Sequence, residues 1–545
     1  MPDPFFASQK NRKRKRPGDA GPSSSKKMPR NAKQNAPKGK RRDEELDSDK
    51  SDEETGNIDD MDLRAPSDDE VMEDEEDPDE TPAEKRLRLA QLYLDSVKNE
   101  MKLADGELDA AEIDRERLSS RLKLDVLENT GKIHLFVADS FDFSQPPILR
   151  TKTGTSVVTA AIASDSGHTL FTAGKDGSIT KWDLTTGKKE QVLAPHRQAK
   201  TKGKGKAVNP DIKGHTDEVL AMAISSDGRY LVSGGKDRRI VLWDAEKAEW
   251  IKAFFGPMCH KDTISALTFR KGSHQLYSAG LDRMVKVYDM SPSVQGYVET
   301  LYGHQDNIVG LDALRRETCV SVGARDKTVR YWKIVDESQL VFRGGGKSRV
   351  REVLEGALAD DETEKVLSHK YIEGSLECVA MIDESTFLSG GDSGSICLWT
   401  TGKKKPIYTQ PLCHGLNVVE SATEGEVKTP RWITSLGTLR FSDLFASGSW
   451  DGEIRIWKLD PKLKGFSLLS TISAPGVVNS LQFVSPSNDF YTNATWAKQG
   501  ETTDTKKDGR VLLVAGIGRE HRLGRWLNVK DGWNRAMVVS LTPSS

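Results

Sequence analysis

The sequence has little cysteine and no long apolar run. Its five cysteines are an odd number and form no C-x-x-C pair, which argues against a disulfide framework or a zinc cluster; they are Cys259, Cys319, Cys378, Cys397 and Cys413. No stretch approaches the roughly 18 consecutive apolar residues of a membrane span, and the N-terminus lacks the apolar segment of a signal peptide. We therefore expect a soluble intracellular protein with no membrane partner, in a reducing compartment.

The chain also lacks an even distribution of charge. The formal net charge is only −2, but residues 1–42 carry fourteen Lys/Arg against two Asp, and residues 43–80 carry twenty-one Asp/Glu against two bases. Such like-charge runs bury too little apolar surface to offset the loss of chain entropy, so we predict that residues 1–80 are a disordered tail, first basic and then acidic. The basic cluster from Asn11 to Pro17 is typical of a nuclear localisation signal.

What the sequence does contain is an internal repeat. A histidine precedes an aspartate by 22 residues, and that aspartate precedes an aromatic residue by six, in three places: His215, Asp237 and Trp243; His260, Asp282 and Tyr288; His304, Asp326 and Trp332. The second half of this unit recurs three times, once with an extra residue, at Asp176 with Trp182, Asp392 with Trp399, and Asp451 with Trp457. Glu520 and Trp526 complete a seventh unit, in which glutamate replaces aspartate.

The repeat resembles the WD-repeat family, because Trp182-Asp183 and Trp243-Asp244 are WD dipeptides and the spacing is about 40 to 45 residues in the regular units. The resemblance implies an all-β fold, a seven-bladed WD40 β-propeller over residues 132–545, preceded by a helical extension over residues 81–131. It also implies that the histidine, aspartate and tryptophan of a blade form a buried structural network. Mutually satisfied residues of this kind are poor candidates for acid/base chemistry.

Two segments compete for the outer strand that closes the last blade. They are residues 132–137, before the repeats, and residues 536–541, at the C-terminal end. We favour the C-terminal segment.

Motifs of catalysis and cofactor binding fail on spacing. Gly346-Lys347-Ser348 has Val341 where a phosphate-binding loop needs a glycine. Cys259-His260 and Cys413-His414 have no paired ligands at usable spacing, so core packing explains them better than metal binding. We predict that the chain is not an enzyme and uses no cofactor and no metal.

Two of the longer spacings between repeat units contain basic loops. In the first, alternating lysines follow Arg197, and Lys202 and Lys204 are candidates for contact with phosphate. In the second, residues 343–351 contain three arginines and one lysine. An exposed surface loop that makes no contact with a partner explains either segment equally well.

Residues 81–127 predict two basic amphipathic helices. Thr81-Pro82-Ala83-Glu84 has the residues of a helix start, and a second helix runs from about Glu107 to Leu127 and ends at Gly131. Packing against the propeller and contact with RNA explain these helices equally well. The basic residues available for RNA contact are Lys85, Arg86, Arg88, Arg121 and Lys123.

The segment from Gly516 to Trp526 breaks the packing rule of the repeat. Alignment on Trp526 puts Arg525 where other blades have leucine, valine or isoleucine, and sequences break their own packing rule mostly at functional sites. Arginine forks suit phosphates or a guanine edge, so we predict four RNA ligands here: Arg519, His521, Arg522 and Arg525. A structural role is the alternative, since Lys181 shows that an equivalent strand tolerates a charge.

Three segments carry a more specific resemblance: Glu520-His-Arg-Leu-Gly-Arg-Trp526, Glu84-Lys-Arg-Leu-Arg-Leu-Ala90 and Arg121-Leu-Lys-Leu-Asp125. Together they are similar to the WD-repeat proteins of the U3 small nucleolar ribonucleoprotein. This resemblance implies binding to the box B/C kink-turn of U3 small nucleolar RNA, beside the kink-turn protein. It further implies a nucleolar address and a role in the small-subunit processome, which processes pre-ribosomal RNA for the small ribosomal subunit, as a monomer within that larger assembly.

The alternative is a nuclear scaffold that binds only proteins. In that case the faces of the propeller hold peptides, as in an adaptor or a chromatin-associated protein, and the tail only directs nuclear import.

Overall fold

The computed structural model describes residues 88, 108–152, 154–196, 212–344, 374–421, 425–497 and 510–543. The predicted tail, the nuclear localisation signal and most of the first predicted helix lie outside this part, as do Lys85, Arg86, Lys202 and Lys204. Within these ranges, no helix is long and apolar enough to cross a membrane.

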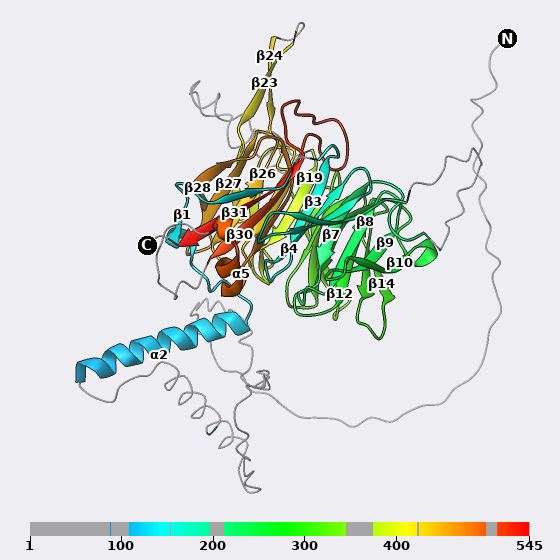
Figure 1. Cartoon of the computed structure of the whole chain (residues 1–545). Helices are drawn as coiled ribbons and strands as arrows, with labels where there is room; N and C mark the ends of the chain where they lie inside the picture. Colours follow the sequence, from blue (N-terminus) through cyan, green and yellow to red (C-terminus); the bar gives the residue numbers. More distant parts are fainter. Residues whose placement is uncertain are drawn as a thin grey trace, which may run out of the picture. The chain divides into compact units, whose positions relative to one another are not determined.

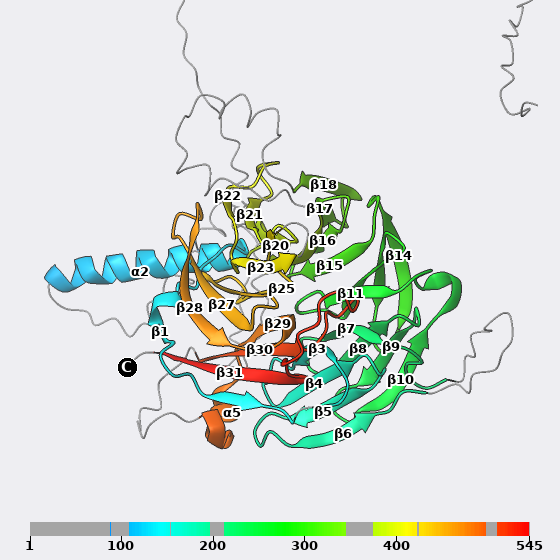
Figure 2. The same ribbon diagram turned by 90° about the horizontal axis from the view of Figure 1, so that it is seen from above.

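Six four-stranded antiparallel blades follow one another along the chain (Figures 1 and 2). Their strands are β3 (Val158–Ala163), β4 (Thr169–Gly174), β5 (Ile179–Asp183) and β6 (Lys189–Leu193); β7 (Val219–Ile224), β8 (Tyr230–Gly235), β9 (Ile240–Asp244) and β10 (Glu249–Phe254); β11 (Ile264–Phe269), β12 (Gln275–Gly280), β13 (Met284–Asp289) and β14 (Gly296–Tyr302); β15 (Ile308–Ala313), β16 (Thr318–Gly323), β17 (Thr328–Lys333) and β18 (Ser338–Arg343); β19 (Leu376–Met381), β20 (Thr386–Gly391), β21 (Ile396–Thr400) and β22 (Tyr408–Gln410); and β25 (Ser435–Thr438), β26 (Leu444–Gly448), β27 (Glu453–Leu459) and β28 (Phe466–Ser473).

The seventh blade combines the two ends of the ring. Its inner strands are β29 (Val477–Val484), β30 (Val511–Gly518) and β31 (Arg535–Pro543), and the N-terminal strands β2 (Ile148–Arg150) and β1 (Phe141–Asp142) both pair with β31. The prediction that the C-terminal strand is outermost is therefore wrong. The C-terminal strand is instead covered by N-terminal strands, which satisfy its outer hydrogen-bonding edge. The competing segment 132–137 does not take this place either, since Leu135 bridges to Ser442 beside the sixth blade.

The innermost strands contact one another in turn, from β3 through β7, β11, β15, β19, β25 and β29 back to β3, so the ring is closed. The seven-bladed all-β propeller predicted from the repeat is confirmed. Inner strands such as β7 are buried almost throughout, because neighbouring blades cover both of their faces, whereas outer strands such as β10 are partly exposed. Apolar clusters fill the spaces between blades; one joins Phe171 of the first blade to Trp243 of the second.

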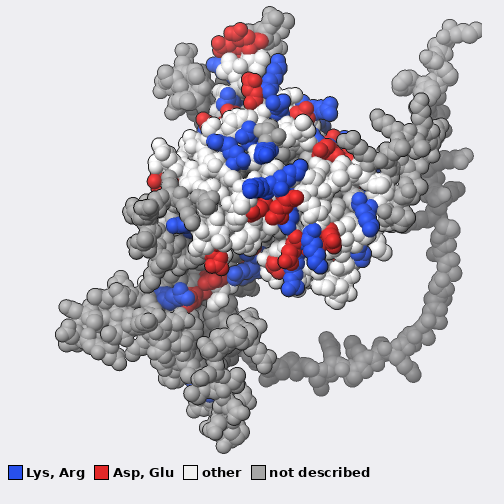
Figure 3. Space-filling model, in the orientation of Figure 1, with Lys and Arg blue, Asp and Glu red and all other residues white. Residues whose placement is uncertain are grey.

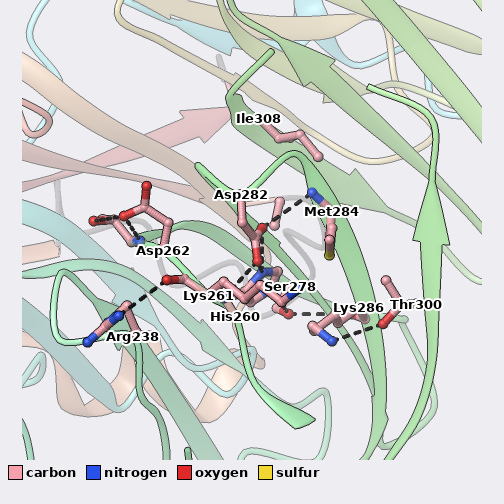
Figure 4. Close-up of polar contacts among 12 residues, drawn as sticks. Arg238, His260, Lys261, Asp262, Ser278, Asp282, Met284, Lys286, Thr300 and Ile308 are labelled. Carbon is pink, nitrogen blue, oxygen red and sulfur yellow. Dashed lines mark hydrogen bonds and ion pairs between the residues drawn. The ribbon is translucent and has the colours of Figure 1, made fainter. Parts of the chain in front are cut away.

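A histidine is hydrogen-bonded to an aspartate and a serine in three of the regular blades, and in two of them a tryptophan completes a network of four side chains. In the second blade, His215 Nδ1 lies 2.9 Å from Asp237 Oδ2, His215 Nε2 lies 2.7 Å from Ser233 Oγ, and Trp243 Nε1 donates to the same hydroxyl. His304, Asp326, Ser321 and Trp332 repeat this arrangement in the fourth blade. In the third blade His260 makes the same contacts with Asp282 and Ser278 (Figure 4). Tyr288 stands at the position of the tryptophan there, and its hydroxyl donates to the Met258 carbonyl at 3.0 Å.

The sixth blade has a complete network that the sequence pattern does not reveal. His414 Nδ1 lies 2.7 Å from Asp451 Oδ2 and His414 Nε2 lies 2.8 Å from Ser447 Oγ, to which Trp457 Nε1 donates. The histidine stands 37 residues before its aspartate instead of 22, which hides it from a search by spacing. The Cys413-His414 pair, which parallels Cys259-His260, was the available signal.

Glu520 and Trp526 do not mark a blade strand. They lie in the connection between β30 and β31, residues 519–534, and the side chain of Trp526 is 57% exposed. The prediction that Arg525 replaces a core residue is therefore wrong, because the third strand of this blade is β31, which supplies its own apolar core. The six-residue spacing in the connection resembles the repeat without forming part of it.

The helix α2 (Leu108–Asn129) lies where the sequence predicts the second helix, and ends as predicted at Gly131. Gly131 has a φ of +67°, and the amides of Gly131 and Lys132 donate to the carbonyls of Glu128 and Leu127. The turn docks on the propeller, since the Glu384 amide donates to the Gly131 carbonyl.

Because the strands of a blade alternate in direction, second-to-third-strand connections and blade-to-blade connections share one face, which we call the upper face. The hairpin of β23 (Leu416–Ser421) and β24 (Gly425–Pro430) and the 519–534 connection belong to this face. The other connections form the lower face, which carries Gly131 and α5 (Asn488–Asn493); Figure 1 shows the hairpin above the ring and α5 below it. Three short 3-10 helices complete the described elements: Ala138–Ser140, Gly256–Met258 and Thr495–Ala497.

Candidate nucleic-acid interface

The 519–534 connection is held down from several sides. Lys175 of the first blade donates to Glu520 Oε2 and to the Gly524 carbonyl, both at 3.0 Å. Asn479 of β29 donates to the Glu520 carbonyl at 3.0 Å, and its side-chain oxygen accepts the Arg522 amide. A loop with this many anchors presents its exposed side chains from a fixed backbone, which reduces the entropy lost on binding.

Arg522 points into the centre of the ring. Its guanidinium donates to the carbonyl oxygens of Ser265 at 2.6 Å and Val309 at 2.5 Å, which belong to the inner strands of the third and fourth blades. Burial lowers the pKa of this guanidinium, and the nearby Glu377 carboxylate opposes that shift. Arg522 therefore anchors the connection to inner strands across the channel, and its guanidinium is not available to bind a phosphate.

His521 is buried beside Arg522. Burial, reinforced by the positive charges of Arg522 and Lys175, lowers the pKa of its imidazole to about 3. The ring is therefore neutral near pH 7, and it lies against Trp526 with 5.4 Å between ring centroids. In this position His521 supports Trp526 and brings no cationic charge to the surface.

Six residues of the connection are exposed, and three of them are of interest for RNA contact: Arg519, Arg525 and Trp526. The other three are Asn528, Lys530 and Asp531. The Arg525 side chain is 83% exposed, with its Nε 3.7 Å from Glu520 Oε2. The guanidinium of Arg519 already makes one internal hydrogen bond, because its Nε donates to the Gly532 carbonyl at 2.8 Å. An exposed arginine beside an exposed tryptophan suits a nucleic acid, since the cation meets phosphate and the indole stacks on a base. Trp526 is not among the candidate RNA-binding residues predicted from the sequence, because its spacing made it a blade tryptophan.

The rest of the upper face is mixed in charge. Exposed bases in its connections include Arg238, Lys261, Arg283 and Arg325, with Asp217 and Asp262 exposed among them. Figure 3 likewise shows Lys/Arg and Asp/Glu interspersed over one side of the propeller. The connection at 519–534 therefore differs from its surroundings by its fixed backbone and its exposed indole more than by its charge.

The helix candidates are not brought together with the loop candidates. Arg121 and Lys123 are exposed on α2, and Arg121 Nε pairs with Asp125 Oδ1 at 3.2 Å; Arg88 is helical. α2 joins the ring at the lower face through Gly131, whereas Arg519 and Arg525 belong to the upper face. Of the two basic loops, only Arg343 and Gly344 of residues 343–351 lie in the described part, and Arg343 is exposed.

The cysteines and acidic residues offer no alternative site in the described part of the chain. All five cysteines are free and buried, and burial raises the pKa of the Cys413 thiol to about 12. Among the described residues, no three His, Cys, Asp or Glu side chains group as metal ligands.

Comparison with known proteins first defines the class. The family model of the WD domain, G-beta repeat, matches residues 147–183, 208–244, 254–289, 295–333 and 425–458. The chain is a WD40 propeller protein, which acts as a non-enzymatic scaffold.

The relatives then define the family. The chain is 32% identical to Ribosomal RNA-processing protein 9 of Saccharomyces cerevisiae, over 87% of this chain and 91% of that protein. It is 35% identical to U3 small nucleolar RNA-interacting protein 2 of Homo sapiens, over 85% of this chain and 83% of that protein. The crystal structure of the RRP9 WD40 repeats matches with a TM-score of 0.57 and 35% identity, over 73% of this chain and 99% of that one. The chain belongs to the WD-repeat family of the U3 small nucleolar ribonucleoprotein.

Proposed function

We propose that this chain binds U3 small nucleolar RNA at its box B/C region, beside the kink-turn protein, as part of the nucleolar small-subunit processome. In this role it supports the processing of pre-ribosomal RNA. Family membership supports the assembly, and the fixed 519–534 connection with its exposed Arg525 and Trp526 supports direct RNA contact.

The connection suits RNA that another protein has already bent. Arg525 and Arg519 contact phosphates, and Trp526 stacks on an unpaired base, so that recognition follows shape more than sequence. Each phosphate neutralised lowers log affinity by about 0.7 to 0.9 per tenfold rise in salt.

The test is a binding titration of the full chain with labelled U3 box B/C RNA in the presence of the kink-turn protein. Trp526→Ala weakens binding about tenfold, since a stacked base contributes ~1–3 kcal/mol, and Arg525→Ala lowers both affinity and salt dependence. Arg283→Ala is the matched control, because Arg283 is an exposed arginine on the same face. If Trp526→Ala and Arg525→Ala both bind as tightly as the Arg283→Ala control, the interface lies elsewhere.

The protein-only scaffold is tested by crosslinking RNA to the chain in cells. Enrichment of a small nucleolar RNA among the recovered sequences supports direct binding. Recovery of background ribosomal RNA alone supports the scaffold instead.

A further inference from the structure

We propose that the hairpin β23–β24 is a docking arm for a protein partner whose surface carries Lys and Arg side chains beside an apolar strip. The hairpin projects from the upper face between the fifth and sixth blades (Figures 1 and 2). Among the described residues, β23 pairs only with β24, so both edges and both faces of this ribbon are without a neighbouring strand.

The hairpin is an addition that the ring does not require. It lies between His414 and Asp451, which stand 37 residues apart instead of the usual 22, and the difference of 15 is the length of segment 416–430. The ends of that segment meet, because the Arg431 amide donates to the Gly415 carbonyl at 3.2 Å. The network of the sixth blade is therefore complete without the hairpin.

The base of the arm is fixed to the sixth blade. The Arg431 guanidinium lies 5.8 Å from the ring centroid of Trp450, and the Ser449 hydroxyl donates to the Trp432 carbonyl. The arm is therefore anchored where it leaves the ring.

The stem exposes apolar surface on both of its faces. Val418 and Val419 are 52% and 50% exposed and, as consecutive strand residues, point to opposite sides. Val419 stands opposite Val427 on one face, and Val418 lies on the other face, which also carries Glu420 and Glu426. An isolated two-stranded hairpin is only marginally stable in water, so covering this surface with a partner stabilises both the contact and the arm.

The charges decide which class of partner fits. Glu420 and Glu426 are directly opposite each other and both exposed, and they outnumber the one exposed base on the same face, Lys428. Figure 3 shows acidic atoms near the outer end of this projection. Carboxylates repel RNA phosphates and attract Lys and Arg, so the occupant is a protein. The basic 519–534 connection on the same face has the opposite character, and the arm does not depend on RNA binding there.

The experiment places a photo-crosslinking amino acid at position 418 of the full chain in cells, on the face that carries Glu420 and Glu426. We expect one protein to be crosslinked, through a peptide rich in Lys and Arg, with the yield falling at least fivefold when Glu420→Lys and Glu426→Lys are combined. A crosslinker at the exposed Val335 of the lower face is the control, and its products stay unchanged. Crosslinking to RNA, to no defined protein, or with a yield insensitive to charge reversal would overturn the proposal.

A second variant separates docking from folding. Replacement of residues 416–430 by Gly-Gly leaves the midpoint of thermal unfolding within about 2 °C of the wild type, since a change at an independent surface element is small. The same variant no longer co-purifies with the partner that position 418 crosslinks in the full chain, but it keeps its affinity for box B/C RNA. A large drop in thermal stability would show that the hairpin is part of the blade, and the proposal would fail. Absence of RNA binding by the wild type would count only against the proposed function.

Discussion

Arg522 of the last blade donates a hydrogen bond to the carbonyl oxygen of Ser265 in the third blade, over a distance of 2.6 Å. The bond crosses the channel of the propeller and ties a surface connection to inner strands that are remote in sequence. Arg522, one of the four residues predicted as RNA ligands, is thereby an internal anchor of the connection, and Arg525, three residues further on, remains exposed.

Substitution of Arg522 should lower the stability of the protein, whereas substitution of Arg525 should lower only its affinity for RNA. Arg522→Met keeps the length of the side chain but leaves the Ser265 and Val309 carbonyls without their donor, so unfolding in denaturant should become easier by about 1–3 kcal/mol. Amide hydrogen exchange in residues 519–534 should also accelerate. Arg525→Met is the matched control and should lower RNA affinity at unchanged stability. Equal denaturation midpoints for Arg522→Met and the wild type would show that the hydrogen bonds of Arg522 do not stabilise the fold.

His414 should matter for folding as much as the histidines of the regular repeats. His414→Ala removes one hydrogen-bond partner from each of the buried side chains Asp451 and Ser447, and we expect a loss of about 2–4 kcal/mol in the free energy of unfolding, close to that of His215→Ala. Urea titration measures both variants. His134→Ala removes a partly exposed ring and should change little; a His414 variant as stable as this control would contradict the network.

Acid should weaken the fourth blade through Asp326. Burial alone would raise the pKa of this carboxyl, but hydrogen bonds from His304 and Thr328 outweigh it and lower the pKa to about 2. The folded state thus favours the charged form more than the unfolded state, whose pKa is about 3.9. The stabilisation is present above about pH 5 and is lost as pH falls toward 2.

The buried His304 acts in the same direction. Burial lowers the pKa of its imidazole and outweighs the hydrogen bond that the ring donates to Asp326, so protonation below about pH 6.5 favours the unfolded state. Denaturant titrations at pH 7, 5 and 3 should therefore show wild type and Asp326→Asn converging as the pH falls. A constant gap between the two proteins would show that the carboxylate charge is not the source of the stabilisation.

Gly131 should couple α2 to the lower face. Its φ of +67° favours glycine, and a Cβ there would lie 2.6 Å from Glu384 Cγ, while the Glu384 carboxylate is held by the amides of Arg315 and Arg316. Gly131→Ala should therefore destabilise the junction by about 1–2 kcal/mol and accelerate hydrogen exchange at the end of α2. Gly402→Ala, where a Cβ meets no atom within 4 Å, should have little effect. If the two substitutions behave alike, the junction is not strained.

The sequence by itself determined the ring and its regular blades. The 22-residue and six-residue spacings identify His215, Asp237 and Trp243 as one unit because all three lie within a single blade and its preceding connection, where separation along the chain is fixed by strand length. The end of α2 at Gly131 is equally local, since one glycine in the left-handed region terminates a helix. Periodicity reveals such features because their physics acts over a few neighbouring residues.

Only the tertiary structure decided which residues of the last blade face solvent. Trp526 mimics a blade tryptophan in its spacing, yet ring closure gives the third strand to β31 and leaves Trp526 exposed. Arg522 and Arg525 are both arginines, three residues apart. Arg522 is held inside the ring because the carbonyls of Ser265 and Val309, far away in sequence, accept hydrogen bonds from it, whereas Arg525 faces solvent. Burial and hydrogen bonding depend on groups that the closed ring brings together, and spacing along the chain does not contain that information.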